Sequence, residues 1–151
     1  MKKLLPVVLS LLLLTGCGGP DISDTPWEGE VNTRTDVTME VVEGTAKPGT
    51  VTVTILSTSE ADIESGNEHD FGIQVEKDGA WYPLEVPENL ANTAEALIFL
   101  KDQPAEMVLT WASRYGSLPD GHYRVIKWFS EFNPEGPPHE HFCLAAEFTL
   151  E

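Results

Sequence analysis

Short segments that alternate apolar and polar residues, separated by turn residues, constrain this chain most. Residues 51–55 place three apolar side chains on one face, and residues 71–75 repeat the pattern. Alternation over four to eight residues is typical of a β-strand with one buried face. Strands of this kind must bury their apolar face against a second layer of structure. The pattern therefore predicts an all-β protein.

Similar strand patterns recur along the chain at residues 37–43, 81–84, 107–113, 123–129 and 142–151. Residues 123–129 are apolar on both faces, whereas the last segment has one apolar face. Lys47-Pro48-Gly49 is a turn, and Asp78-Gly79 predicts a tight β-hairpin. Residues 88–100 break the alternation and predict a short helical turn followed by an extended piece. About seven short strands with almost no helix predict an antiparallel β-sandwich, with a small barrel as the alternative.

The N-terminus carries an export signal. Lys2 and Lys3 precede an apolar run over residues 4–14, which is too short to span a bilayer stably. Thr15-Gly16-Cys17 follows, and this arrangement resembles the signal of a bacterial lipoprotein. The resemblance implies a signal peptide over residues 1–16, with a lipid attached to Cys17. Two or more acyl chains would anchor the protein to the extracytoplasmic face of the cell membrane. An ordinary cleaved signal or an uncleaved anchor is the alternative.

Residues 17–35 are rich in Gly, Pro, Asp and Thr and show no periodicity, so we expect the lipidated cysteine and a flexible linker there. Trp27 is the exception, and we expect it to dock on its own domain. Residues 36–151 then form one domain, because a segment of this length suffices for one ordinary core but hardly for two.

Charge excludes one class of partner. Without Lys2 and Lys3, seven Lys and Arg residues stand against 25 Asp and Glu residues, which gives a net charge of −18. A surface of this charge repels nucleic acid and anionic lipid headgroups. Because Cys17 is assigned to the lipid, Cys143 has no partner for a disulfide within the monomer.

Residues 118–124, Leu-Pro-Asp-Gly-His-Tyr-Arg, resemble the turn and the opening of strand F in bacterial immunoglobulin-like domains. The Asp78-Gly79 hairpin followed by Trp81-Tyr82-Pro83 also resembles the domains of this type in bacterial surface lipoproteins. The resemblance covers about residues 51–151. It implies a single immunoglobulin-like (Ig-like) β-sandwich in which Tyr123 is the corner tyrosine, bonded back to the preceding turn, and Val125 points into the core. The chain departs from the pattern in lacking a cysteine pair between the sheets and in its longer last hairpin.

Catalytic motifs for hydrolases, nucleotide-binding enzymes, zinc proteases and redox proteins do not occur in the sequence. His141 and Cys143 lie two residues apart, but no nearby residue would orient the imidazole or form an oxyanion hole. We therefore expect no enzymatic activity, no catalytic residue and no cofactor.

Two long polar connections, at residues 57–70 and 131–141, correspond to the B–C and F–G loops, which lie at the same end of an Ig-like sandwich. They carry the candidate recognition residues His69, Phe132, His139 and His141. If this topology holds, His69 converges with His139, Glu140 and His141. Imidazole and carboxylate ligands suit zinc, so a metal site there stays open beside a plain recognition surface or mere connection.

The sequence thus predicts a lipid-anchored binding or structural module, whose partner would be an envelope or extracellular protein or a glycan. Two alternatives remain: a proteinase-inhibitor-like module that presents residues 133–138, and an envelope protein that senses a metal or ligand with these two loops. We expect Trp81, Trp111 and Trp128 to fill the core or cover its edge, with a carbohydrate platform as the alternative.

Overall fold

The computed structural model describes residues 18–87 and 95–151, so Cys17 and most of the expected helical turn lie outside the described residues. The described part contains nine β-strands and one short helix. They are β1 (Val37–Val41), β2 (Thr50–Ser57), β3 (Ile63–Gly66), β4 (Gly72–Lys77), β5 (Ala80–Pro83), β6 (Ala96–Phe99), β7 (Ala105–Thr110), α1 (Ala112–Tyr115), β8 (Gly121–Glu131) and β9 (His139–Leu150).

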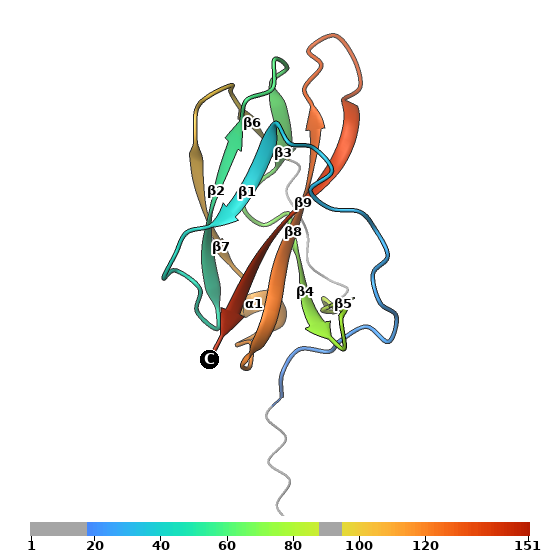
Figure 1. Ribbon diagram of the computed structural model, residues 1–151, viewed down its shortest axis with the longest axis vertical. Helices are drawn as coiled ribbons and strands as arrows, with labels where there is room; N and C mark the ends of the chain where they lie inside the picture. The colour runs from blue at the N-terminus through green and yellow to red at the C-terminus, as the bar shows by residue number, and fades with distance from the viewer. Residues whose placement is uncertain (1–17, 88–94) are drawn as a thin grey trace, which may run out of the picture.

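The strands form two antiparallel sheets that pack face to face, which confirms the predicted sandwich (Figure 1). One sheet has the order β1-β2-β7. In the other sheet, one edge of β8 pairs first with β4 and further along with β3; β5 lies beyond β4, and β6 lies beyond β3. The other edge of β8 pairs with β9. Nine strands replace the predicted seven. β6 lies in the extended piece expected within residues 88–100, and β3 is added because β3 and β4 are two pieces of one interrupted strand along β8. Ser65 pairs with Phe129 and Gly72 pairs with Ile126 on the same edge.

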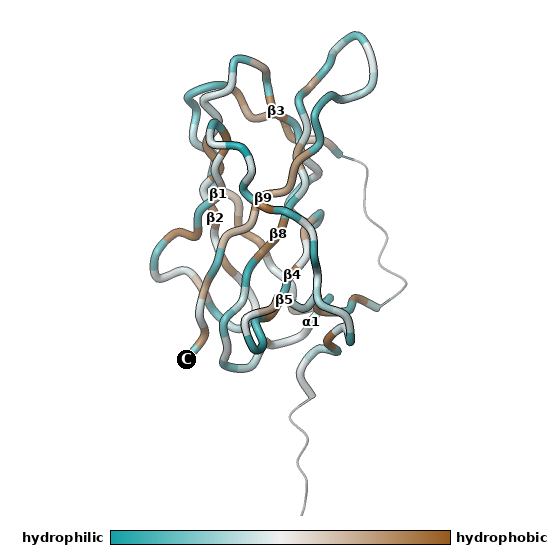
Figure 2. Tube along the Cα trace, turned by 45° about the vertical axis from the view of Figure 1, so that its right-hand side comes forward, coloured by the Kyte–Doolittle hydropathy of each residue, from teal (hydrophilic) through white to brown (hydrophobic). Residues whose placement is uncertain are grey.

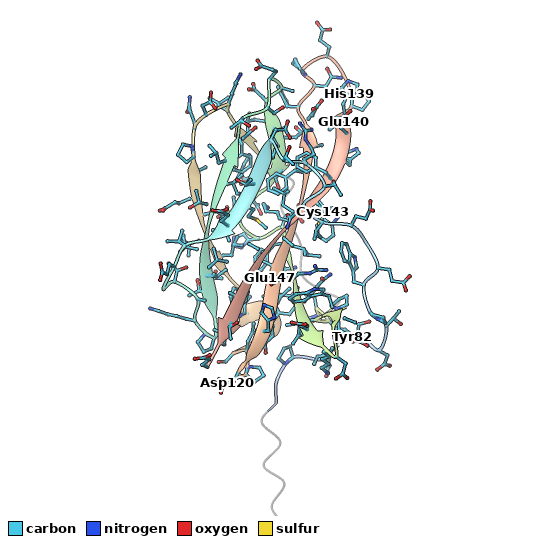
Figure 3. The ribbon with its side chains drawn as sticks, in the orientation of Figure 1. Tyr82, Asp120, His139, Glu140, Cys143 and Glu147 are labelled. Carbon is cyan, nitrogen blue, oxygen red and sulfur yellow. The ribbon has the colours of Figure 1, made fainter. Side chains whose placement is uncertain are left out.

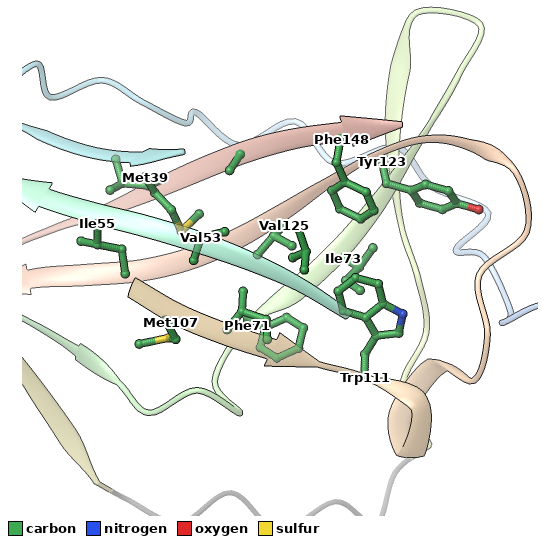
Figure 4. Close-up of a cluster of buried hydrophobic side chains, with 14 of the residues drawn as sticks. Met39, Val53, Ile55, Phe71, Ile73, Met107, Trp111, Tyr123, Val125 and Phe148 are labelled. Carbon is green, nitrogen blue, oxygen red and sulfur yellow. The ribbon is translucent and has the colours of Figure 1, made fainter. Parts of the chain in front are cut away.

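The core lies between the sheets, where the alternating residues meet. Val51, Val53 and Ile55 are fully buried, as the alternation predicts. Figure 4 shows Trp111, Tyr123 and Phe148 together at one end of this core. The Phe148 ring stacks on both others, with centroids 5.8 Å from Trp111 and 5.7 Å from Tyr123. Figure 2 shows hydrophobic stretches along β8 and β9 and hydrophilic ones in the loops at the ends.

The β4–β5 hairpin confirms the turn predicted at Asp78-Gly79. Lys77 pairs with Ala80, so the loop has two residues, and both have positive φ angles of 51° and 79°. This is the type I′ geometry that suits the twist of a hairpin. The predicted strand at residues 107–113 is shorter in the structure. It ends at Thr110 and α1 follows; at this point the Trp111 indole donates a 2.8 Å hydrogen bond to the Pro48 carbonyl.

The predicted flexible linker differs from the structure. Residues 18–35, here called the strap, run from the end of the sandwich near α1 along the outside of the β8 sheet and into β1 (Figure 1). Ile22 forms a bridge with Leu84, and the Trp27 N–H donates to the Trp81 carbonyl at 2.7 Å. Trp27 and Val31 pack on a small buried cluster formed by Ile126, Cys143 and Ala145. Apolar packing and strand-like hydrogen bonds therefore hold a segment that composition alone describes as a linker.

The strap also explains a wrong expectation about β9. The alternation predicts one buried face, formed by Phe142, Leu144, Ala146, Phe148 and Leu150, and all five are buried. Cys143 and Ala145, on the other face, are buried as well, at 7% and 6% exposure. The strap covers this outer face, which makes β8 and β9 doubly buried along part of their length.

Lys127 occupies the interruption between β3 and β4. Its side chain is fully buried, and Nζ donates hydrogen bonds to the carbonyls of Gly66, Asn67 and Asp70 at 2.7–2.8 Å. These carbonyls belong to the turn where the chain leaves the sheet, so the ammonium supplies the donors that a neighbouring strand would have supplied. Burial lowers the pKa of Lys127 to about 8, although nearby Asp70 and Glu68 act in the opposite direction.

Candidate functional site

The β8–β9 hairpin and the β2–β3 connection lie side by side at the end of the sandwich away from α1 (Figure 1). The backbone N–H of Phe132 donates a 2.8 Å hydrogen bond to the carbonyl of Asp62, which joins the two connections. Phe132 itself is 38% exposed at the base of the hairpin. The two loops thus form one continuous end surface.

Asn133 organises the hairpin loop from within. Its side-chain nitrogen donates to the Pro137 carbonyl at 3.1 Å and lies 3.1 Å from Nε2 of His139. Its side-chain oxygen accepts a 3.1 Å bond from the Glu135 N–H. An Asn side chain that bonds the backbone two residues ahead is a common device for ordering a turn. The loop is therefore held by its own side chain.

The predicted convergence of histidines is wrong for His69. Ile63–Gly66 forms a strand, so the chain travels along β8 away from the hairpin before it reaches His69. The His69 carbonyl accepts a 2.5 Å bond from Arg114 of α1, whereas His139 pairs with Glu131 at the far end of β8. His69 therefore does not join the hairpin residues.

A β-bulge separates the two remaining histidines. Phe129 pairs with Phe142 and Glu131 pairs with His139, so β9 places two residues, Glu140 and His141, opposite Ser130 alone. Glu140 adopts a positive φ of 45°, as the extra residue of a bulge commonly does. Because directly paired residues share a face, His139 lies on the Glu131 side of the sheet and His141 on the Ser130 side. Figure 3 labels His139 and Glu140 at this end and Cys143 further along β9.

No metal centre is present among the described residues: no group of three or more His, Cys, Asp or Glu side chains there is arranged to hold an ion. The set His69, His139, Glu140 and His141 is divided by β3 and by the bulge. The same part of the chain contains no helix with the length and hydropathy needed to span a bilayer.

Arg34, at the end of the strap, holds the carboxylates beneath the hairpin. It donates two hydrogen bonds to Asp36, at 2.5 and 2.8 Å, and one to Glu131 at 2.8 Å. Glu140 lies 3.6 Å away, and the guanidinium stacks on the Phe142 ring at 4.9 Å. The Arg34 hydrogen bonds hold the pKa of Asp36 below its usual value. Arg34 thus neutralises the acidic residues on the Glu131 side of the hairpin.

The opposite side of the hairpin carries a shallow groove of about 210 Å³. It lies on the outer face of the sheet, and its lining includes Glu64, Gly66, Ala96, Trp128, Ser130 and His141. Trp128 is 47% exposed. The strap packs on Ile126, two residues earlier on the same face, but does not extend over Trp128. The predicted role of Trp128 as core or edge cover is therefore incomplete, since nearly half of this side chain faces solvent.

Hydrogen bonds fix the walls of the groove, and one lining position has room only for glycine. Ser130 Oγ donates to the Glu64 carboxylate at 3.2 Å, and Ser65 Oγ donates to the Trp128 carbonyl at 2.7 Å. A side chain at Gly66 would meet the Asp70 carboxylate at 2.1 Å, so only glycine fits without a shift. Ile98, directly paired with Glu64, is 41% exposed and forms an apolar rim.

Two carboxylates at the groove make no ion pair within the described ranges. They are Glu64 on β3 and Glu95 immediately before β6. Glu131 and Glu140, by contrast, are held by Arg34, and Glu60 is held by Lys101. The groove therefore combines an exposed indole with two uncompensated negative charges.

At the other end of the sandwich, Tyr123 holds the turn that precedes β8. The Tyr123 hydroxyl donates a 2.8 Å hydrogen bond to the carbonyl of Pro119 in the preceding turn. His122 lies between Glu76, at 2.5 Å, and Glu147, at 3.1 Å, with its ring edge-on to Trp81. Figure 3 shows Asp120 and Tyr82 at this end, far along the molecule from His139.

Sequence reasoning missed the groove and Lys127. The strand at residues 123–129 was apolar on both faces, but the pattern does not say which outward residues another segment covers. The sequence did contain one signal: Ile126, Trp128 and Ser130 occupy alternate positions and therefore share the outer face, which becomes more polar toward the end of the strand. Finding the groove also required β3, whose single apolar residue Ile63 gives no periodic signal.

Comparison with known proteins identifies a family. A family model described as a bacterial Ig-like domain matches residues 33–149. No curated protein and no solved structure matches the chain.

Proposed function

The chain belongs to the bacterial Ig-like domain family, and from this premise we propose that it is a lipid-anchored binding module of the cell envelope without catalytic activity. Ig-like domains of bacteria serve as structural or binding modules. The observation that favours binding is the groove beside Trp128, because an exposed indole and the exposed Ile98 flank the same hollow and together form an apolar patch with a polar lining.

The route of the strap supports a direction for this module. Gly19 lies beside Pro119, where the position of a side-chain Cβ would be 3.7 Å from the proline ring. Pro119 precedes β8, at the end of the sandwich opposite the β8–β9 hairpin (Figure 1). A lipid on Cys17, two residues before Gly19, would therefore hold the α1 end near the membrane. The groove and the hairpin would then face away from it.

The surroundings of Cys143 argue against a thiol nucleophile. Its side chain is 7% exposed beneath the strap, and burial raises the pKa of the thiol. The reactive thiolate is thus disfavoured at neutral pH. His141 lines the groove and is exposed, so no described base lies ready to activate the sulfur.

Photo-crosslinking in intact cells tests the binding role. A benzophenone amino acid is placed at position 98, on the rim of the groove, or at position 108, on the opposite sheet. Val108 is 57% exposed and provides the matched control. We expect discrete adducts from position 98 that disappear when Trp128→Ala is added, and none from position 108. Equal adducts from both positions, or adducts that persist without Trp128, would contradict the proposal.

Lipid attachment is tested separately. Cells fed a labelled fatty acid should yield a labelled protein, and Cys17→Ser should abolish the label. An unlabelled product from the unmodified chain would remove the anchor from the proposal. The crosslinks at position 98 would still report on binding, so the two parts can fail independently.

A further inference from the structure

We infer that the groove beside Trp128 accepts a basic peptide segment of a partner protein, with an arginine or lysine side chain over the indole between Glu64 and Glu95. This inference rests on the proposed binding role of the groove and names the chemistry of its occupant.

The aromatic face comes first. Arginine and lysine side chains bind the faces of Trp, Tyr and Phe, and Trp binds them best. The protein uses this contact internally several times. Arg124 lies over Trp81 at 4.4 Å and over Trp27 at 5.3 Å, and Arg34 lies over Phe142 at 4.9 Å. Trp27 and Trp81 thus already hold a cation, whereas Trp128 holds none from the described part of the chain. The half-exposed face of the Trp128 indole can therefore accept a cation from a partner.

The carboxylates supply the second argument. Glu64 is fixed on one wall by its bond from Ser130, and Glu95 stands on the lining beside Ala96. Neither has a cationic partner among the described residues. A cation over Trp128 would therefore meet two opposite charges within one groove, and a charge-assisted hydrogen bond is stronger than a neutral one.

The whole molecule adds a long-range attraction. The net charge of the full sequence is −16, and it becomes −18 once Lys2 and Lys3 are removed. Such a field speeds the approach of a basic partner and repels an acidic one. A neutral glycan would stack on the indole face and donate hydroxyl hydrogen bonds to the carboxylates, but it would neutralise neither charge and would gain nothing from the field. The charges therefore favour a cationic occupant.

Isothermal titration of the full chain in detergent with a hexa-arginine peptide tests the inference, with hexa-glutamine as the neutral control. We expect hexa-arginine to bind, and its affinity to fall as salt is raised, because salt screens exposed charges. Trp128→Ala should weaken binding about tenfold, as expected for loss of one cation–π contact. Trp128→Phe keeps an aromatic face, so it should retain most of the affinity.

A matched pair of double variants separates the groove from general attraction. Glu64→Gln with Glu95→Gln removes two charges from the groove, and Glu40→Gln with Glu106→Gln removes two exposed charges from the opposite sheet. We expect the groove pair to weaken binding about tenfold and the distant pair by less than about twofold, because the distant pair lies on the other sheet and salt screens the attraction of exposed charges that do not contact the ligand.

Three outcomes would overturn the inference. In the first, hexa-arginine fails to bind. In the second, both double variants weaken its binding equally. In the third, the Trp128→Phe and Trp128→Ala variants both bind hexa-arginine as tightly as the unmodified chain does. If the neutral oligosaccharide chitohexaose binds in a Trp128-dependent manner and hexa-arginine does not, the cationic occupant is wrong while the proposed binding role stands. If the chain with an intact Trp128 gives no crosslinks from position 98, that result instead contradicts the binding role itself.

Discussion

Asn32 pairs with Ala145 through both ends of its side-chain amide. The amide nitrogen donates to the Ala145 carbonyl at 3.1 Å, and the amide oxygen accepts from the Ala145 N–H at 2.9 Å. The Asn32 backbone N–H also donates to the Cys143 carbonyl at 2.9 Å. One residue of the strap thus supplies the hydrogen bonds of a neighbouring strand to the edge of β9. An edge without such cover is a template for association with another chain.

Replacing Asn32 should therefore destabilise the domain and favour association. Asn32→Gly retains the positive φ of 56° without strain and removes only the amide. We expect a loss of about 1–3 kcal/mol in the free energy of unfolding, because two buried backbone groups lose their partner. Urea denaturation measures this loss, and Thr33→Ala, at an exposed neighbouring position, is the control. Equal stability of the two variants would show that the edge cap contributes nothing.

Lys127 should give the protein an unusual alkaline response. Its pKa is about 8 in the folded protein and 10.5 in the unfolded chain, so between these values the unfolded chain binds more protons. The free energy of unfolding should consequently rise with pH over this interval relative to that of Lys127→Met. At pH 7 the variant should be about 2–4 kcal/mol less stable, because three carbonyls lose their donor. Parallel pH profiles of the two proteins would contradict the assigned pKa.

The Tyr123 hydroxyl can be isolated from its ring. Tyr123→Phe keeps the stack on Phe148 and loses the bond to Pro119, so we expect a cost of about 1 kcal/mol. Tyr82→Phe is the matched control, since the Tyr82 hydroxyl makes no hydrogen bond within the residues that the structure describes. Thermal unfolding of both variants makes the comparison. A cost that is the same at both positions would deny Tyr123 its role in holding the turn.

The Arg34–Asp36 pair should stabilise the protein near neutral pH and lose this effect in acid. Because Arg34 lowers the pKa of Asp36 in the folded state, this contribution is complete above the ordinary value of 3.8. It is lost as pH falls through the lowered pKa. The stability advantage of the unmodified protein over Arg34→Met should therefore shrink below about pH 4, which chemical denaturation across pH 3–7 measures. Lys101→Met breaks the exposed pair with Glu60. The unmodified protein should be little more stable than this variant at any pH.

Much of the sandwich could be predicted from local pattern. Alternation identified the inward faces of β2 and β9, and Asp78-Gly79 identified a hairpin because both turn residues must tolerate positive φ. The rest depended on contacts between distant residues. Trp27 and Val31 pack on Ile126 and bury it, whereas Trp128 stays half exposed. No local pattern in β8 predicts this difference. His69 was misplaced because β3 is short and polar, and a single bulge at Glu140 separated His139 from His141.

In the proposed function, the chain is tethered at the α1 end and presents its groove and hairpin away from the membrane. Two single-cysteine variants test it in a Cys143→Ala background: Ser117→Cys beside Gly18 and Gly19, and Glu135→Cys in the hairpin loop. Each carries a fluorophore, and the lipidated protein is inserted into vesicles that contain a quencher-labelled lipid. We expect strong quenching at position 117 and little at position 135. Equal quenching at both positions, stronger quenching at position 135, or none at either would contradict it.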